Sequence, residues 1–87
     1  MEELPSLKEE NFKISNIYVP AKRRRTLDPV RVNEIAESIL EEGQKTPVWL
    51  RTDGDRYVLV EGLQRLEACK SLCEKMIIGI IVQSRKR

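Results

Sequence analysis

The chain of 87 residues contains no histidine, only two cysteines and 5% aromatic residues. Without histidine, catalysis by a histidine acid, base or nucleophile is excluded. Because there is also no C-x-x-C pair, the sequence offers no ligand set for a structural zinc ion, and we assign no metal-binding residues. No apolar run approaches the roughly 20 residues of a membrane span. We therefore expect a small cytoplasmic protein without a membrane partner.

Charged residues make up 34% of the chain, but the net charge is only +2. So small a net charge does not indicate a general polyanion binder, and any electrostatic function must depend on local clusters. At this length, folding buries only about 60 to 65% of the unfolded surface, so we expect one domain with one modest core. We expect a flexible arm over residues 1–11, the domain over 12–83 and a basic tail over 84–87.

The two cysteines, Cys69 and Cys73, are four residues apart in a segment with helical periodicity. A helix places such a pair on one face with Cβ atoms about 5 to 6 Å apart, which is too far for a relaxed disulfide. The same face carries the apolar stripe of the helix. The sequence therefore predicts two free thiols buried in the core.

The stretch from Tyr57 to Leu72 contains a change in apolar period. Residues 57–60 form an almost continuous apolar run, which is typical of a buried strand. After Gly62, apolar residues recur every three or four positions, as they do in a helix. The sequence predicts a strand that turns at Gly62 into a helix, with Arg65 in its first turn and its end near Glu74.

The first turn of this helix is a candidate anion site, because its backbone N–H groups lack intrahelical partners and the helix dipole adds about half a positive charge there. The N–H groups of Leu63 and Gln64 would donate to phosphate, Gly62 would permit close approach, and Arg65 would provide a bidentate fork. The alternative is that Gly62 only closes a tight turn and Arg65 is a solvated helix residue. From this stretch alone, the alternative is the more common case.

The remaining chain is predicted to supply a first strand from Phe12 to Val19, a strand over residues 46–52 and a last strand over 76–82. Asp28 and Pro29 indicate the start of a helix that ends at Gly43, because Asp caps free N–H groups and Pro suits the first helical position. Asp53 and Gly54 predict a hairpin turn. The helix predicted between Asp28 and Gly43 has an apolar stripe that consists of Val32, Ile35, Ala36, Ile39 and Leu40. We expect an α+β fold, a small mixed sheet with two to three packed helices.

A basic run lies in the connection after the first strand. Such a run is usually a solvated loop, but phosphate binding is the sharper hypothesis. We expect this loop and the corner at Gly62 to converge at one end of the sheet, where ligands bind in many α/β proteins. We therefore assign the run to the outer phosphates of a nucleotide; its residues are Lys22, Arg23, Arg24 and Arg25.

Two segments resemble the ParB/sulfiredoxin superfamily. VEGLQRLEA, residues 60–68, is similar to its G-x-x-R corner, and LDPVRVNEIAESILEEGQKTPVWLR is similar to its upstream helix, glycine stop and Pro-initiated strand. The resemblance runs from about Ile14 to Val82 and implies the fold of that superfamily. It also implies nucleotide contacts by Arg31, where sulfiredoxins have a lysine, and by Ser38, where they have a hydroxyl residue.

The resemblance is incomplete at positions that carry catalysis in the superfamily. Leu63 stands where sulfiredoxins have the attacking cysteine and where ParB proteins have a glutamate associated with hydrolysis. The ParB-like free-serine kinases have a catalytic glutamate soon after the first strand, and the corresponding stretch VPAKRRR has no acid. We therefore expect no sulfiredoxin activity, we assign no catalytic residue, and we leave NTP hydrolysis and phosphotransfer open.

The sequence thus predicts a regulatory nucleotide-binding module for a nucleoside triphosphate, ATP or CTP. Mg²⁺ normally accompanies a triphosphate, with Asp28 or Glu61 as candidate ligands. The rival hypothesis is a DNA-associated or protein-docking regulator that uses no nucleotide. Because no helix-turn-helix fits before Arg87, we expect at most weak, non-specific DNA contact through residues 22–25 and 85–87.

Overall fold

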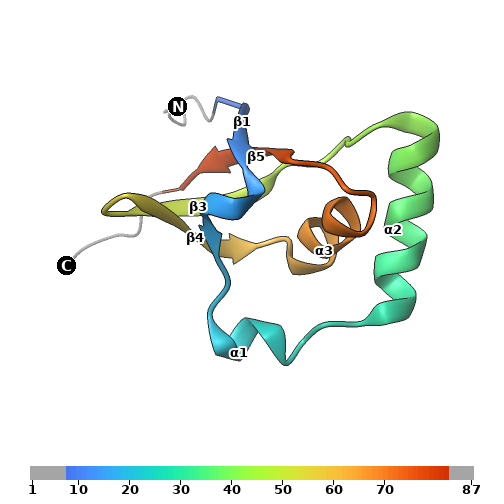
Figure 1. The fold of residues 1–87 in the computed structure, drawn as a ribbon, viewed down its shortest axis with the longest axis horizontal. Helices are drawn as coiled ribbons and strands as arrows, with labels where there is room; N and C mark the ends of the chain where they lie inside the picture. Colours follow the sequence, from blue (N-terminus) through green and yellow to red (C-terminus); the bar gives the residue numbers. More distant parts are fainter. Residues whose placement is uncertain (1–7, 83–87) are drawn as a thin grey trace, which may run out of the picture.

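The computed structural model describes residues 8–82, which form a five-stranded mixed sheet with three helices (Figure 1). The strands are β1 (Glu10–Lys13), β2 (Ile17–Tyr18), β3 (Val48–Asp53), β4 (Arg56–Glu61) and β5 (Met76–Ile81). The helices are α1 (Ala21–Arg24), α2 (Pro29–Glu42) and α3 (Leu63–Ser71). The predicted α+β fold is confirmed. No helix among these residues is long and apolar enough to cross a membrane.

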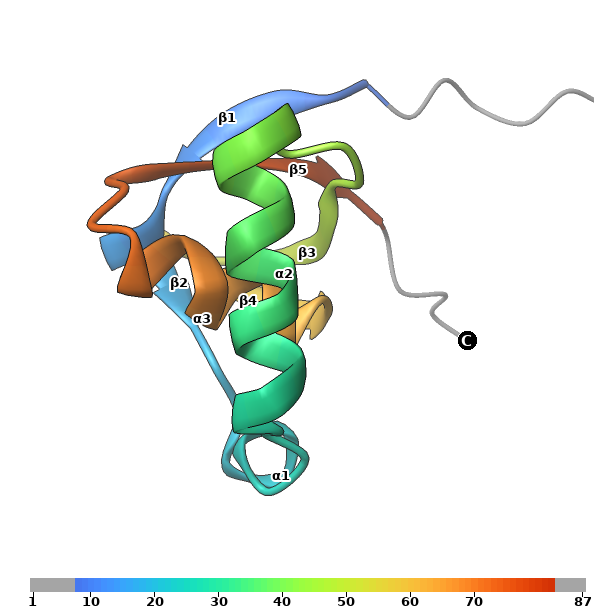
Figure 2. The ribbon, with the colours of Figure 1, turned by 90° about the vertical axis from the view of Figure 1, so that its right-hand side faces the viewer.

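The strand order across the sheet is β1-β5-β3-β4-β2. The pairs β1–β5 and β3–β4 are antiparallel, whereas β3–β5 and β2–β4 are parallel. Figures 1 and 2 show α2 and α3 on the same side of the sheet, with α3 between the sheet and α2. We call the sheet face beneath α3 the inner face and the opposite face the outer face. Since α3 follows β4 directly, its N-terminus lies at the end of β4.

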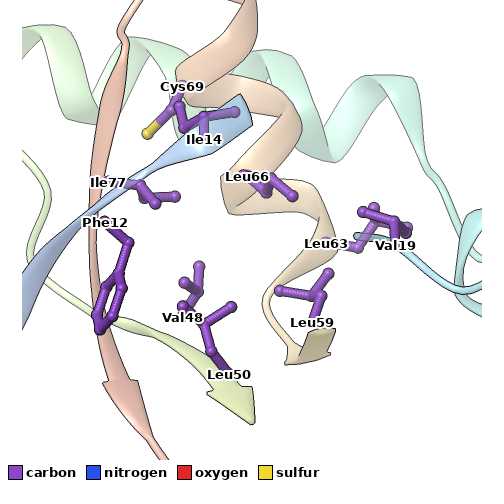
Figure 3. Packing of buried hydrophobic residues seen from close by; sticks show 10 residues of the cluster. All are labelled: Phe12, Ile14, Val19, Val48, Leu50, Leu59, Leu63, Leu66, Cys69 and Ile77. Carbon is purple, nitrogen blue, oxygen red and sulfur yellow. The ribbon is translucent and has the colours of Figure 1, made fainter. Parts of the chain in front are cut away.

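The core lies between the inner face and α3 (Figure 3). Full burial of one such side chain contributes about 1.5 to 3 kcal/mol, so this cluster provides most of the driving force for folding. Cys69 belongs to it, which confirms the predicted burial of that thiol. The cluster consists of Phe12, Ile14, Val19, Val48, Leu50, Leu59, Leu63, Leu66, Cys69 and Ile77.

The predicted start and end of α2 are confirmed. The carboxylate of Asp28 accepts a hydrogen bond from the Val30 N–H at 3.1 Å, and Pro29 occupies the first helical position. At the other end, Gly43 has a φ of 81° and donates to the Ile39 carbonyl. The predicted apolar stripe is wrong at Leu40, which is 72% exposed. A single neighbouring helix, α3, covers only the narrower stripe formed by the other four residues.

The prediction of a single first strand from Phe12 to Val19 is wrong, because the structure has two short strands there. The chain breaks after β1 into a 3-10 turn at Ile14–Asn16, so β1 and β2 lie on opposite edges of the sheet. Ile14 is buried and its N–H donates to the Lys75 carbonyl at 2.9 Å, which fixes the break. β1 also begins at Glu10, within the predicted arm; the rest of that arm below Lys8, and the predicted tail at 84–87, lie outside the described residues.

The end of α3 also differs from the prediction. The helix stops at Ser71 instead of Glu74, because the Cys73 N–H donates to the Lys70 carbonyl and the Glu74 N–H donates to the Cys69 carbonyl. This bonding is the Schellman pattern, which places Cys73 in the left-handed region with a φ of 62°. Cys73 is therefore exposed, and its predicted burial is wrong. Glycine normally occupies this position, so a cysteine there does not indicate the end of a helix.

We predict that Gln44→Ala destabilises the fold by about 1 to 3 kcal/mol, because it leaves backbone groups of β5 without partners. The Gln44 amide accepts from the Ile78 N–H at 2.8 Å and donates to the Ile78 carbonyl at 2.9 Å. Urea unfolding measures the change. Lys45→Ala is the control, since Lys45 is exposed with one ion pair to Glu42, and it should cost less than about 1 kcal/mol. Equal losses in the two variants would contradict the role of the Gln44 amide.

Candidate functional site

The loop before α2 and the N-terminus of α3 lie together, as the sequence predicted. The side chain of Gln64, in the first turn of α3, accepts from the Asp28 N–H and donates to the Thr26 carbonyl, both at 2.8 Å. These bonds join residues 36 and 38 positions apart in the chain. Gln64 thus fixes the start of α2 against the corner. This role of its side chain was not predicted, because we had expected only its backbone N–H to be used.

The basic run is not a loop. Its first residues form the short helix α1, whose N–H groups at Arg23 and Arg24 both bond to the Pro20 carbonyl. Pro20 has a φ of −61°, which suits a helix start, and long unbranched side chains favour the helix. The helix disperses the run, because successive side chains point in different directions.

Only part of the basic run faces the corner. Arg23 lines the cavity at the corner, whereas Lys22 lines, with Arg23, a neighbouring cavity of about 460 Å³. Arg24 turns back to donate to the Val19 carbonyl at 3.3 Å, and Arg25 is exposed and lines none of the cavities that we describe. The structure therefore brings Arg23, but not Arg24 or Arg25, to the predicted site.

The N-terminus of α3 presents its backbone donors without a cap. The first backbone bond runs from the Leu66 N–H to the Gly62 carbonyl at 2.9 Å, so the N–H groups of Leu63, Gln64 and Arg65 precede the hydrogen-bond ladder. Gly62 offers no side-chain cap, and the first turn contains no acidic residue. The side chain of Leu63 is buried in the core, so this residue can act on a ligand only through its backbone.

A cavity of about 180 Å³, which we call the corner cavity, opens in front of these donors. Three arginines line it, one from each of the helices α1, α2 and α3. The lining contains a single carboxylate, that of Glu61. This excess of positive charge at a helix N-terminus favours an anion. The lining residues are Arg23, Thr26, Arg31, Ile35, Glu61, Gly62, Leu63, Gln64 and Arg65.

Arg65 occupies the centre of the site. It lines the corner cavity and two neighbours, one beside Trp49 and one beside Ser38. Its side chain is half-buried, and within residues 8–82 it has no ion-pair partner. Arg31, by contrast, has a long contact of 3.6 Å with the Glu34 carboxylate. Since a half-buried cation is costly to leave unpaired, the geometry of Arg65 favours a bound anion.

Gly62 has a structural reason to be glycine. Its φ is 110°, in the left-handed region, and an added Cβ would lie 2.7 Å from a methyl carbon of Val48. The direction in which a side chain would project is filled by the core. The structure thus explains this glycine by packing and backbone conformation, and the predicted need for close approach of a ligand is not required to explain it.

Ser38 lies apart from the corner cavity. It lines a small cavity of about 120 Å³ between α2 and the segment before β3, which it shares with Lys45, Thr46 and Arg65. Only Arg65 and Ile35 connect this cavity with the corner cavity. Arg31 does line the corner cavity, as the resemblance implied.

Glu61 and Trp49 lie side by side at the corner, and the sequence did not predict this proximity. Leu50 pairs with Leu59, but Trp49 pairs with Glu61, so Val60 is an extra residue in β4. Such a bulge turns the following side chain out of the regular alternation. As a result Glu61 lines both the corner cavity and the cavity beside Trp49. No periodicity in the sequence marks a bulge, although the adjacent glycine is a weak sign of one.

No group of three or more potential metal ligands occurs among residues 8–82. Of the two candidate Mg²⁺ ligands, Asp28 already caps α2 through its carboxylate, whereas Glu61 lines the corner cavity. A metal at this site would therefore be held by Glu61 and by the ligand itself.

Cys69 is a core thiol and not an activated nucleophile. Burial, and to a smaller extent the nearby Glu74 carboxylate, raise the pKa of the Cys69 thiol, while Arg65 partly opposes them. The thiol is therefore protonated at neutral pH, and it is only 2% exposed.

We predict that Cys73 reacts quickly with a maleimide in the native protein, whereas Cys69 reacts at least about ten times more slowly, because its labelling requires local opening. Peptide mass spectrometry after timed quenching measures both rates. The Cys73→Ser variant provides the rate of Cys69 alone. Equal labelling of the two cysteines would contradict the burial of Cys69. This expectation replaces the sequence-based one, in which both thiols were protected.

A mixed sheet, a strand-glycine-helix corner and arginines from three directions define a small α+β domain built around a helix N-terminus. The chain belongs to the ParB N-terminal domain family, whose model matches residues 2–87. It is 32% identical over 62 residues to a probable chromosome-partitioning protein ParB of Campylobacter jejuni. That match covers 71% of this chain but only 22% of the relative, so the chain spans about a fifth of its length.

Solved structures share the fold. Sulfiredoxin from Arabidopsis thaliana has a TM-score of 0.79 at 25% identity, over 88% of this chain and 86% of that one. The chromosome-partitioning protein ParB from Caulobacter crescentus, complexed with CTP-gamma-S, has a TM-score of 0.76 at 22% identity, and the match covers 91% of this chain and 46% of that one. A free serine kinase mutant in complex with ADP has a TM-score of 0.77 at 18% identity, and the match covers 91% of this chain and 33% of that one. The last two likenesses concern the fold alone.

Proposed function

We propose that this domain binds a nucleoside triphosphate, ATP or CTP, with its phosphates at the N-terminus of α3. The observation that carries the proposal is the half-buried Arg65, which lacks an ion-pair partner within residues 8–82 and lies beside three backbone donors at an uncapped helix start. Arg23 and Arg31 add charge on the far side of the corner cavity. Charge-assisted bonds of this kind are the strong ones for phosphate.

Fold relatives support a nucleotide as the source of that phosphate. The Caulobacter ParB structure contains CTP-gamma-S and the serine kinase structures contain ADP or AMP. The corner cavity, at about 180 Å³, suits a phosphate chain, and its neighbours provide room for the remainder of a nucleotide. Glu61 would hold a Mg²⁺ ion that comes with the nucleotide, and the ion would neutralise part of the phosphate charge.

The proposal is binding, with a regulatory role, and no catalytic residue is assigned. The Leu63 side chain is in the core and has no nucleophilic atom, and the Cys69 thiol is buried and protonated. These observations support the expected lack of sulfiredoxin activity. Hydrolysis or transfer of the terminal phosphate would have to use other groups at the corner, where Glu61 provides the single carboxylate of the lining.

The rival function is a DNA-associated or protein-docking regulator. It is favoured by the exposed side chains of Lys22 and Arg25, which point away from the corner cavity or lie outside it. Such contacts would be non-specific and would weaken steeply with salt. They do not explain why Arg65, at the helix start, has no ion-pair partner within the described part of the chain.

A panel of ATP, CTP, GTP, UTP and inorganic tripolyphosphate, with and without Mg²⁺, tests the proposal. The midpoint temperature of thermal unfolding should rise with the preferred nucleotide, because a ligand at a hundred times its dissociation constant adds about 2.7 kcal/mol of stability. Calorimetry then gives the affinity. If no nucleotide and no tripolyphosphate binds at millimolar concentration, the proposal is wrong and the docking function takes its place.

A further inference from the structure

The cavity beside Trp49 shares three of its lining residues with the corner cavity. It has a volume of about 310 Å³, and we call it the Trp49 cavity. Glu61, Gly62 and Arg65 line both it and the corner cavity, so the two cavities are adjacent. The remaining walls are Thr46, Pro47 and Trp49. A molecule in the Trp49 cavity would therefore touch whatever anion occupies the corner.

Trp49 lies in β3 with much of its surface open to solvent. It alternates with the fully buried Val48 and Leu50, so β3 places it on the outer face of the sheet. Its side chain is 45% exposed, although tryptophan is among the residues most strongly buried on average. Its partner across the strand pair is Glu61, at the bulge. The exposed indole therefore lies beside the charged groups of the corner.

The walls of the Trp49 cavity favour a flat ring over a bulky apolar group. Trp49 and Pro47 provide apolar surfaces, and an aromatic face stacks on any planar ring. Glu61 and Thr46 add hydrogen-bonding oxygens at the rim, which suit the N–H or O–H groups of a ring. The charged groups of Glu61 and Arg65 would oppose a purely apolar occupant, because they would lose water without gaining partners.

We propose that the Trp49 cavity is the subsite for a flat ring that stacks on the indole, beside a phosphate held in the corner cavity. The inference rests on the proposed function for that phosphate. The ring has two sources with the same chemistry: it is the base of the bound nucleotide, or it belongs to a second small molecule that meets the nucleotide at its terminal phosphate.

The chain contains one tryptophan, so its fluorescence reports on Trp49 alone. Tripolyphosphate should bind with little change in emission, whereas a ligand with a ring should quench it. Trp49→Leu should weaken binding of that ligand by roughly 5- to 100-fold, the range for loss of one base stack, and leave tripolyphosphate affinity unchanged. Trp49→Phe should retain part of the affinity. Tyr18→Leu is the matched control, because Tyr18 is similarly exposed, at 43%, but does not line the Trp49 cavity.

Two titrations distinguish the sources. If ATP or CTP quenches the fluorescence of Trp49 and its affinity falls in Trp49→Leu, the ring is the base of the nucleotide. If the nucleotide binds without quenching, and adenosine added to the saturated protein quenches instead, the ring belongs to a second molecule. The inference is overturned if phosphate binding is intact but neither titration affects Trp49 and Trp49→Leu binds as wild type does. A protein that binds neither tripolyphosphate nor nucleotide contradicts the proposed function instead.

Discussion

The Arg65→Ala variant should bind nucleoside triphosphate about ten- to a hundredfold more weakly than the wild type and should still fold. Hydrogen bonds to a charged group contribute about 1.5 to 3 kcal/mol, and each 1.4 kcal/mol is a factor of about ten in affinity. Arg65 lines all three cavities at the corner and lacks an ion-pair partner within residues 8–82, so its removal breaks no internal ion pair there. Calorimetry with nucleotide and with tripolyphosphate measures the loss.

Arg25→Ala is the matched control, because it removes the same charge from an exposed position outside the corner cavity. Its effect should be small and should vanish as salt is raised. Gln64→Ala should also cost less affinity than Arg65→Ala, but it should lower stability, since it breaks the bonds to Thr26 and Asp28. If Arg65→Ala binds as well as wild type, or if Arg25→Ala weakens binding equally, the corner is not the phosphate site.

Gly62→Ala, which adds a single methyl group at the corner, should lower the free energy of unfolding by about 2 to 5 kcal/mol. The left-handed conformation costs a residue with a Cβ about 1 to 2 kcal/mol, and overpacking a core adds about 1 to 3 kcal/mol. Both apply, because φ is 110° and the new Cβ would lie 2.7 Å from a methyl carbon of Val48. A folded chain of this length has a free energy of unfolding of roughly 4 to 13 kcal/mol, so the loss is a substantial part of the stability of the domain.

Gly54→Ala separates the two causes. Gly54, in the turn between β3 and β4, has a φ of 62° but no atom within 4 Å of an added Cβ. Only the conformational cost of about 1 to 2 kcal/mol should remain. Urea unfolding of the two variants gives the difference, and a double-mutant cycle of Gly62→Ala with Val48→Ala gives the coupling from the clash. Equal losses at Gly54 and Gly62 would show that Val48 moves aside without cost.

The elements that the sequence predicted correctly are those set by local chemistry. Asp28, Pro29 and Gly43 mark the bounds of α2, and the change of period at Gly62 marks the strand-to-helix corner. These signals act over a few residues, through capping, a fixed φ or the position of apolar side chains. For that reason the sequence placed Arg65 at a helix start, whereas the ParB/sulfiredoxin fold was implied by the resemblance of residues 60–68 and of the upstream helix and strand.

Where the sequence was misleading, either a partner distant in the chain decides the structure or a local motif uses an unusual residue. The break after β1 depends on a bond between Ile14 and Lys75, and the end of α3 puts a cysteine where the usual signal is glycine. The basic run became a helix that sends Arg23 toward the corner and Arg24 away from it. Direction of this kind is set by rotation about the helix axis, which a run of like charges does not encode.

The amino-acid sequence by itself determined the corner: the strand, the glycine, the helix start and the arginine in its first turn, because each depends on neighbours within one or two turns of chain. Only the tertiary structure decided which other groups meet there. Gln64 bonding to Thr26 and Asp28, Glu61 turned by a bulge, and Trp49 beside Gly62 all depend on strand register and on contacts between segments far apart in the chain. Those contacts form only when the core packs, and local preference along the chain does not specify them.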